Sequence, residues 1–180
     1  MKKEIAKFLF LVLVALGAGP SGAAFYQWST TPSSNATADP SINWQEGQSP
    51  SSVNDSARAM MAVLASWRKD VSGQLVDGGT TSAITLTTNT SYPNLAALDG
   101  QMVAFLHNSS GNNAGVTLNI DGTGAVALAI GDTPIPAGAM LAGGFYTATY
   151  YAASNQYRLN GAINDSFNIS LGGILWSTLS

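Results

Sequence analysis

One stretch, residues 51–73 (SSVNDSARAMMAVLASWRKDVSG), constrains the fold of this chain more than any other. Ser51 or Ser52 is suited to cap the first turn of a helix, and Gly73 is suited to end it. Asp55 near the start and two basic residues near the end complement the dipole of such a helix. The sequence therefore predicts one helix over residues 51–73.

Apolar side chains recur along this helix at alternating spacings of four and three residues, the a/d pattern of helices that pack against copies of themselves. The pattern covers about three heptads, close to the lower limit for a coiled coil. An ordinary amphipathic helix lying on its own domain shows a similar stripe, so both interpretations stay open. We favour self-association, because the preceding segment offers no apolar partner layer. The expected contacts are Val53, Ala57, Met60, Leu64, Trp67 and Val71.

After a turn-rich hinge at residues 74–79, the hydrophobic period changes from that of a helix to that of strands. Strands are expected at 83–88, 102–106, 116–120, 126–130, 145–151 and 157–159, separated by clusters of Gly, Asn, Asp and Pro. One short helical turn is expected at 94–98. Residues 74–161 therefore predict a small antiparallel β-sandwich or barrel, and the chain as a whole is expected to be mainly β with one long helix in its N-terminal half.

Residues 1–24 have the layout of a secretory signal, with a basic start, an apolar run and a small-residue stretch. Cleavage after Ala24 is one interpretation, and a retained hydrophobic anchor plugged into a partner is the other. The run is short for a membrane span. The leader therefore indicates membrane targeting or export unless it is retained as an anchor.

Residues 25–50 hold three prolines and many Ser, Thr and Asn, and they have too little apolar area to form a core. We expect an extended arm. Spaced aromatic side chains on such an arm are suited to anchor in grooves of another protein. The alternative is that they fold back over the helix. The aromatic residues are Phe25, Tyr26, Trp28 and Trp44.

Charged residues make up only 9% of the chain, which suits fibres outside the cell better than a cytosolic enzyme. The net charge of −3 and the seven basic residues argue against a nucleic-acid partner. The chain has no cysteine, so it has no disulfide or thiolate metal site. Residues 162–180 form a C-terminal tail that ends on an apolar cluster led by Trp176, expected to pack on its own domain or on a neighbouring subunit.

No catalytic, cofactor-binding or metal site is predicted, and a hydrolase is the weakest of the functions considered. The sole histidine, His107, is expected to be a solvated loop residue. Five aspartates lie in turns, where Asp serves the backbone: Asp77, Asp99, Asp121, Asp132 and Asp165. The stretch 119–124 lacks the further ligands of a calcium loop and favours a hairpin turn.

Two sets of residues resemble a known family. Residues 25–73 (FYQWSTTPSSNATADPSINWQEGQSPSSVNDSARAMMAVLASWRKDVSG) closely resemble the N-terminal region of phage and prophage tail fibre proteins. ITLTTN, LDGQMVAFLHN, GVTLNIDGTGA and YTATYYAASNQYRLNG resemble the small β-domain that follows it in such proteins. The resemblance covers residues 25–161, and INWQEG with PSSVNDSARAMM is its most specific part. The leader departs from the pattern, since such proteins begin near the equivalent of AFYQW.

The resemblance implies a non-enzymatic virion protein that forms a homotrimer, located in the tail. The arm then attaches to other tail or virion proteins, the helix forms a trimeric neck with the seam as its interface, and the β-domain projects outward toward a host polysaccharide or outer-membrane component. A different class is a secreted bacterial adhesin or carbohydrate-binding module that carries a phage-derived domain. Its ligand face is expected at Tyr150, Tyr151 and Tyr157 together with the loop at 108–115.

Overall fold

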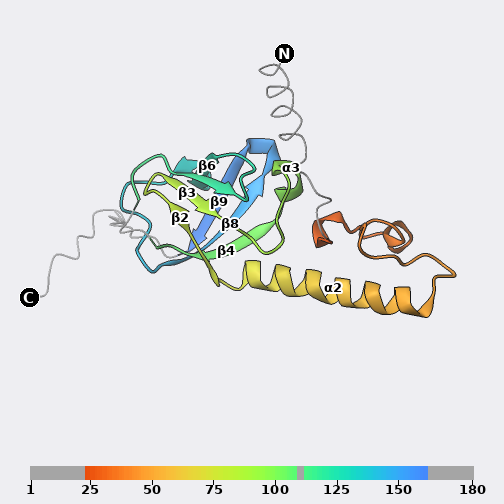
Figure 1. Ribbon diagram of the computed structural model, residues 1–180. Helices are drawn as coiled ribbons and strands as arrows, with labels where there is room; N and C mark the ends of the chain where they lie inside the picture. The colour runs from red at the N-terminus through yellow and green to blue at the C-terminus, as the bar shows by residue number, and fades with distance from the viewer. Residues whose placement is uncertain (1–22, 109–111, 162–180) are drawn as a thin grey trace, which may run out of the picture.

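The computed structural model describes residues 23–108 and 112–161, which form a nearly closed β-barrel-like sheet, one long helix and an N-terminal arm (Figure 1). The long helix, α2 (Pro50–Val71), extends away from the barrel, and its C-terminal part lies beside strand β4 (Met102–Leu106). The arm, red and orange in Figure 1, starts near the barrel and runs out along the helix. The chain is therefore mainly β with one long helix in its N-terminal half, as the sequence predicts.

Helix α2 starts one residue earlier than predicted. Pro50 occupies its first turn, and the Oγ of Ser49 accepts a hydrogen bond from the N–H of Ser52 at 3.3 Å. Proline fits the first helical position because it has no N–H to satisfy there. The cap is therefore Ser49 and not one of the two serines after Pro50. Gly73 follows the last turn with a φ of +78°, which suits its predicted role as the stop.

The nine strands have the order β1-β4-β8-β9-β6-β5-β3-β2, with β7 paired to β6. All six predicted strands fall on observed ones, whereas the two-residue strands β1, β2 and β7 are too short to show a period. The remaining bounds are β1 (Leu75–Val76), β2 (Gly78–Gly79), β3 (Ala83–Leu86), β5 (Thr117–Ile120), β6 (Val126–Ile130), β7 (Thr133–Pro134), β8 (Phe145–Tyr151), β9 (Gln156–Gly161), the helical turn α3 (Leu95–Leu98) and the 3-10 turns η1 (Phe25–Gln27), η2 (Pro32–Asn35) and η3 (Ala152–Ser154).

The prediction of an antiparallel domain is wrong for three strand pairs. β1 runs parallel to β4, β3 to β5, and β6 to β9. Parallel neighbours need a crossover connection, and the one between β3 and β5 contains α3 and β4. The sheet is therefore mixed.

The chain itself brings the two edges of the sheet together. β1 and β2 stand at opposite ends of the strand order, yet only Asp77 separates them along the chain. Alternate residues of the strands point inward, and the interior is filled by large side chains that are fully buried, among them Ile84, Phe105, Leu118, Tyr146 and Tyr157. The loop between β5 and β6 is a hairpin turn with positive φ at Asp121 and Gly122, as predicted.

Candidate interaction surfaces

One face of helix α2 contacts its own chain. The buried residues of the helix are Ser56, Val63 and Asp70, spaced seven residues apart. Seven residues make nearly two turns, so these side chains lie on one face. The Ser56 hydroxyl donates to the carbonyl of Asn43 in the arm at 3.1 Å and accepts from its N–H at 3.0 Å. This intrachain face is not the one that the heptad pattern singles out.

The predicted seam lies on a different part of the helix surface. Leu64 follows Val63 and therefore points about 100° away from it around the helix axis. Leu64 is 46% exposed and Val53 is 39% exposed, while Ala57 and Val71 in the same row are half-buried. Single exposed apolar residues are common, but a row at heptad spacing forms a continuous apolar surface.

Two seam residues contact the arm of the same chain. Met60 lines a small cavity of about 120 Å³ together with Trp28 and Ile42. The ring of Trp67 meets that of Phe25 edge-on, with 5.6 Å between centroids, although 40% of Trp67 stays exposed. The arm therefore covers one edge of the seam and leaves its middle open.

The arm is not extended, and the prediction of an extended segment is wrong. Its polar side chains close local turns: the Oδ1 of Asn35 accepts from the N–H of Ser29 at 2.7 Å. The Oδ2 of buried Asp39 accepts from the N–H of Ala24 at 3.0 Å and from the indole N–H of Trp28 at 3.3 Å. These bonds satisfy the backbone, so the arm can pack along helix α2 as the alternative interpretation has it.

Three of the four arm aromatics are half-buried against their own chain. Phe25 contacts Trp67 of the helix. The ring of Tyr26 packs on that of Tyr92 next to the barrel, with 5.3 Å between centroids, and the indole N–H of Trp28 donates to Asp39 within the arm. Trp44 is the most exposed of the four, at 38%. Their use as a virion anchor stays a prediction, and Trp44 is the ring best placed to serve it.

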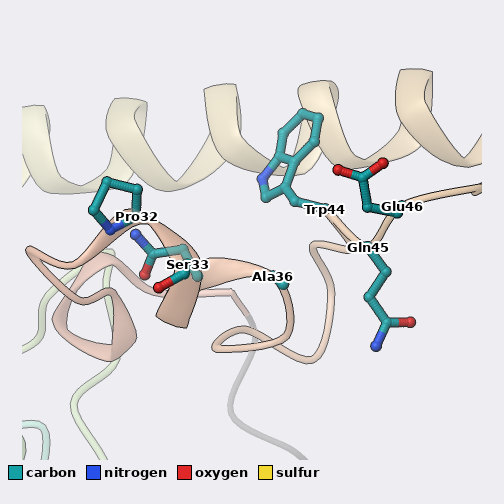
Figure 2. Close-up of a pocket in the computed structure, with 7 residues that line it drawn as sticks. Pro32, Ser33, Ala36, Trp44, Gln45 and Glu46 are labelled. Atoms are coloured by element: carbon teal, nitrogen blue, oxygen red, sulfur yellow. The ribbon is translucent and has the colours of Figure 1, made fainter.

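Trp44 borders an open cleft that is lined entirely by residues of the arm (Figure 2). In Figure 2 the Trp44 ring and the Glu46 carboxylate point to the helix side, whereas Gln45 points away. The polar groups therefore do not converge around the ring, as they do in a small-molecule site. The cleft is lined by Pro32, Ser33, Asn35, Ala36, Trp44, Gln45 and Glu46.

A buried carboxylate attaches helix α2 to the barrel. Asp70, with no exposed surface, accepts four hydrogen bonds: Oδ1 from the N–H of Asn89 at 2.7 Å and from its Nδ2 at 2.8 Å, and Oδ2 from the N–H of Thr90 at 2.9 Å and from its Oγ1 at 2.5 Å. The sequence reading missed this residue. An acidic side chain in the last turn of a helix opposes the helix dipole, and that was the available signal.

A second carboxylate holds the same loop from the other side. Asp121, in the β5–β6 turn, accepts from the N–H and hydroxyl of Thr88 at 2.7 and 2.6 Å and from the N–H of Tyr92 at 2.9 Å. The loop at 87–92 is therefore fixed between the helix and the barrel. Because Tyr92 also stacks on Tyr26, the arm, helix and barrel meet at this joint.

The prediction that His107 is solvated is wrong. His107 is fully buried, and its Nδ1 lies 2.5 Å from the Oδ2 of Asp77, whose side chain is 1% exposed. The Oδ1 of Asp77 accepts from the N–H of Asn108 at 2.7 Å. The pair lies at Asp77, where the two edges of the barrel meet, so it has a structural task there. The position of His107 in the sequence, at a strand end next to a Gly/Asn/Ser loop, gave no sign that it would be buried.

The predicted ligand face is wrong for two of its three tyrosines. Tyr150 is 4% exposed and Tyr157 is fully buried, because both point inward from adjacent strands. Tyr151 alone is exposed, and the guanidinium of Arg158 lies 5.5 Å from its ring centroid. Burial raises the pKa of Tyr157 to about 12. Burial, followed by the charge of Asp70, also raises the pKa of Tyr92.

The aspartates mostly serve the backbone, as expected. Asp77 and Asp121 do so as described above, and Asp99 accepts from the N–H of Ala152 at 2.9 Å. Asp132 instead pairs with Arg158 at 2.6 Å, and Asp165 lies outside the described residues. Within residues 23–108 and 112–161, no three His, Cys, Asp or Glu side chains gather as metal ligands, and no helix is long and apolar enough to cross a membrane.

Comparison of the sequence with protein-family models gives no match, and comparison with curated proteins gives no significant match. The functional interpretation therefore depends on the surfaces described above and on the sequence resemblance.

Proposed function

We propose that this chain is a non-enzymatic structural subunit of a phage tail, acting as a short homotrimeric fibre or as an adaptor at a fibre base. The observation that carries the proposal is the open seam of helix α2. Leu64 and Val53 stay exposed even though the helix packs on its own arm and barrel with another face. A helix with one face occupied within the chain and a second apolar face at heptad spacing is suited to bind copies of itself.

The distribution of charge on helix α2 supports the same proposal. Asp55 and Arg58 form an exposed ion pair at 2.8 Å, and they lie on the helix side opposite the seam residues Val53 and Leu64. A self-associating seam must be free of unpaired charge, because a buried charge without a partner is costly. The low overall charge of the chain fits a protein that buries much of its surface between subunits.

In this proposal the three regions have separate tasks. The arm attaches this protein to another tail or virion protein, with Trp44 as the leading contact. The helices form the neck, and the barrel extends the stalk or touches the host surface. The resemblance of residues 25–161 to tail fibre proteins supports this order. The alternative of a carbohydrate-binding module is weakened, because Tyr150 and Tyr157 are buried and do not form the ligand face on which it depended.

Mass spectrometry of purified phage particles tests the proposal. The chain is expected at fixed stoichiometry with the other tail proteins, and the recombinant protein is expected to have the mass of three chains in light scattering. Recovery of the chain from culture fluid only, with none in the particles, would contradict a virion role and favour the secreted adhesin.

A further inference from the structure

A second exposed apolar surface lies on the outside of the barrel. The strand register pairs Val76 with Leu106, and Leu106 with Phe145. Residues paired across neighbouring strands point to the same side of a sheet, so these three side chains form one row across β1, β4 and β8. They are 54%, 37% and 50% exposed, respectively. We call them the sheet row.

The sheet row lies at an edge that carries no charge. β1 is the first strand in the sheet order, and none of β1, β4 and β8 contains a charged residue. The edge strand β1 is only two residues long and leads through Asp77 into β2, so the surface of interest is the row of side chains and not the open backbone of the edge. A row of three large apolar side chains at an uncharged edge is therefore a surface that fits a protein partner.

The sheet row begins where the seam of helix α2 ends. Val71 is the last seam residue, and Gly73 follows two residues later. Gly73 lies directly against the ring of Phe145, since a Cβ at Gly73 would fall 1.9 Å from the Cε2 of that ring. The C-terminal end of helix α2 therefore lies directly against the sheet row.

We propose that neighbouring copies of this chain cover the sheet row, so that the oligomer interface extends from the helices onto the barrels. This inference rests on the proposed self-association of helix α2. In a parallel symmetric bundle, equivalent residues of all chains meet at the same height along the axis. The C-terminal ends of the three helices, and the sheet row beside each of them, are then brought close to their counterparts.

Single-cysteine cross-linking tests the inference, because the natural chain has no cysteine. The variants are Val76→Cys in the sheet row, Leu64→Cys in the seam and Ala127→Cys as the control. Ala127 is exposed on β6, and three strands separate β6 from β1 in the sheet order. Each full-length protein is treated with a short bifunctional maleimide at low concentration and analysed by denaturing gel.

We expect Val76→Cys and Leu64→Cys to yield covalent dimers at comparable efficiency, at least tenfold above Ala127→Cys. Efficient cross-linking at position 64 with only the control level at position 76 overturns the inference and leaves the proposed trimer intact. Control-level cross-linking at both positions, together with the mass of one chain, overturns the inference and the trimer together.

A second measurement distinguishes cover by another copy from cover by the same chain. Val76→Cys is labelled with a monofunctional maleimide, alone and combined with Leu64→Asp. We expect slow labelling in the oligomer and at least tenfold faster labelling when Leu64→Asp separates the chains. Slow labelling that persists in separated chains overturns the inference and assigns the cover to the chain's own residues.

Discussion

Asp70 shows how one side chain can decide whether two elements stay together. Its carboxylate is fully buried, and four donors from two consecutive residues, Asn89 and Thr90, surround it. Hydrogen bonds to a charged group are stronger than neutral ones, and a donor left unpaired in a buried site costs the full price of its desolvation. The hydrogen bonds of this one residue therefore tie the last turn of helix α2 to the loop at 87–92.

We predict that Asp70→Ala lowers the free energy of unfolding by about 3 kcal/mol or more, because it leaves buried N–H and hydroxyl donors unpaired. Urea denaturation followed by circular dichroism measures the change. The matched control is Asp55→Ala in the same helix, whose ion pair with Arg58 is largely exposed and is expected to contribute nothing measurable. Equal effects of the two substitutions would contradict the structural role of Asp70.

The buried tyrosines predict a loss of stability in alkali. Unfolded tyrosine ionises near pH 10, whereas burial raises the pKa of Tyr157 to about 12 and also raises that of Tyr92. Between these values the native state binds more protons than the unfolded state, so stability falls as pH rises. We expect a constant melting temperature up to about pH 9 and a steady fall above about pH 10. Tyr157→Phe should reduce the slope, and an unchanged slope would refute the assignment.

At the scale of residues, the sequence shows the type of a side chain but not what surrounds it. His107 and Asp77 are 30 positions apart, and each has a local context typical of a loop. They meet because the chain joins the two edges of the barrel at Asp77. Asp77, Asp99 and Asp121 bond to the backbone as predicted, but their partners lie 29 to 53 positions away, so the sequence indicated the role and not the partner.

Helix α2 has a face that packs on its own chain and a second, largely exposed apolar face, the seam, which this prediction concerns. We expect Leu64→Asp to reduce the mass in light scattering to that of one chain while the far-ultraviolet circular dichroism stays native. The introduced charge lies on the open seam, so it disrupts association without entering the intrachain face. Met60 is unsuited to this test, because it also lines the cavity beneath the arm.

Ala62→Asp is the matched control for this substitution. Ala62 is exposed on the same helix and lies on the side opposite Leu64. It is expected to keep the mass of the wild-type oligomer. A wild-type mass for Leu64→Asp would remove the physical basis of the helical neck.

At the scale of elements, periodicity predicted the helix and six strands because the spacing of apolar residues along the chain reflects the local backbone geometry. The strand partners were not predictable in this way. Alternation in Ala83–Leu86 shows that one face is buried, but it does not show that β5 rather than β4 lies beside it. The folded form of the arm was not predicted for a related reason. Its turns are held by Asn35 and Asp39, and the arm sequence does not indicate that it packs on helix α2.

The proposed role as a stalk requires that the helix keeps a fixed direction relative to the barrel. Two contacts that hold this direction are the Asp70 joint and the packing of the Phe145 ring on Gly73. Both lie at the C-terminal end of α2, while the rest of the helix extends beyond the barrel (Figure 1).

We predict that Gly73→Ala disturbs this arrangement more than its backbone conformation alone explains. Gly73 and Gly47 share a φ of +78°, so alanine is strained at either position, by about 1 kcal/mol. A Cβ at Gly47 meets nothing within 4 Å, whereas one at Gly73 enters the Phe145 ring. Denaturation should therefore show a larger loss for Gly73→Ala than for Gly47→Ala. In a Phe145→Ala background, Gly73→Ala should cost no more than Gly47→Ala does, because the ring that the new Cβ would enter is absent. Equal losses at both glycines in the wild-type background would mean that the ring does not hold the helix in place.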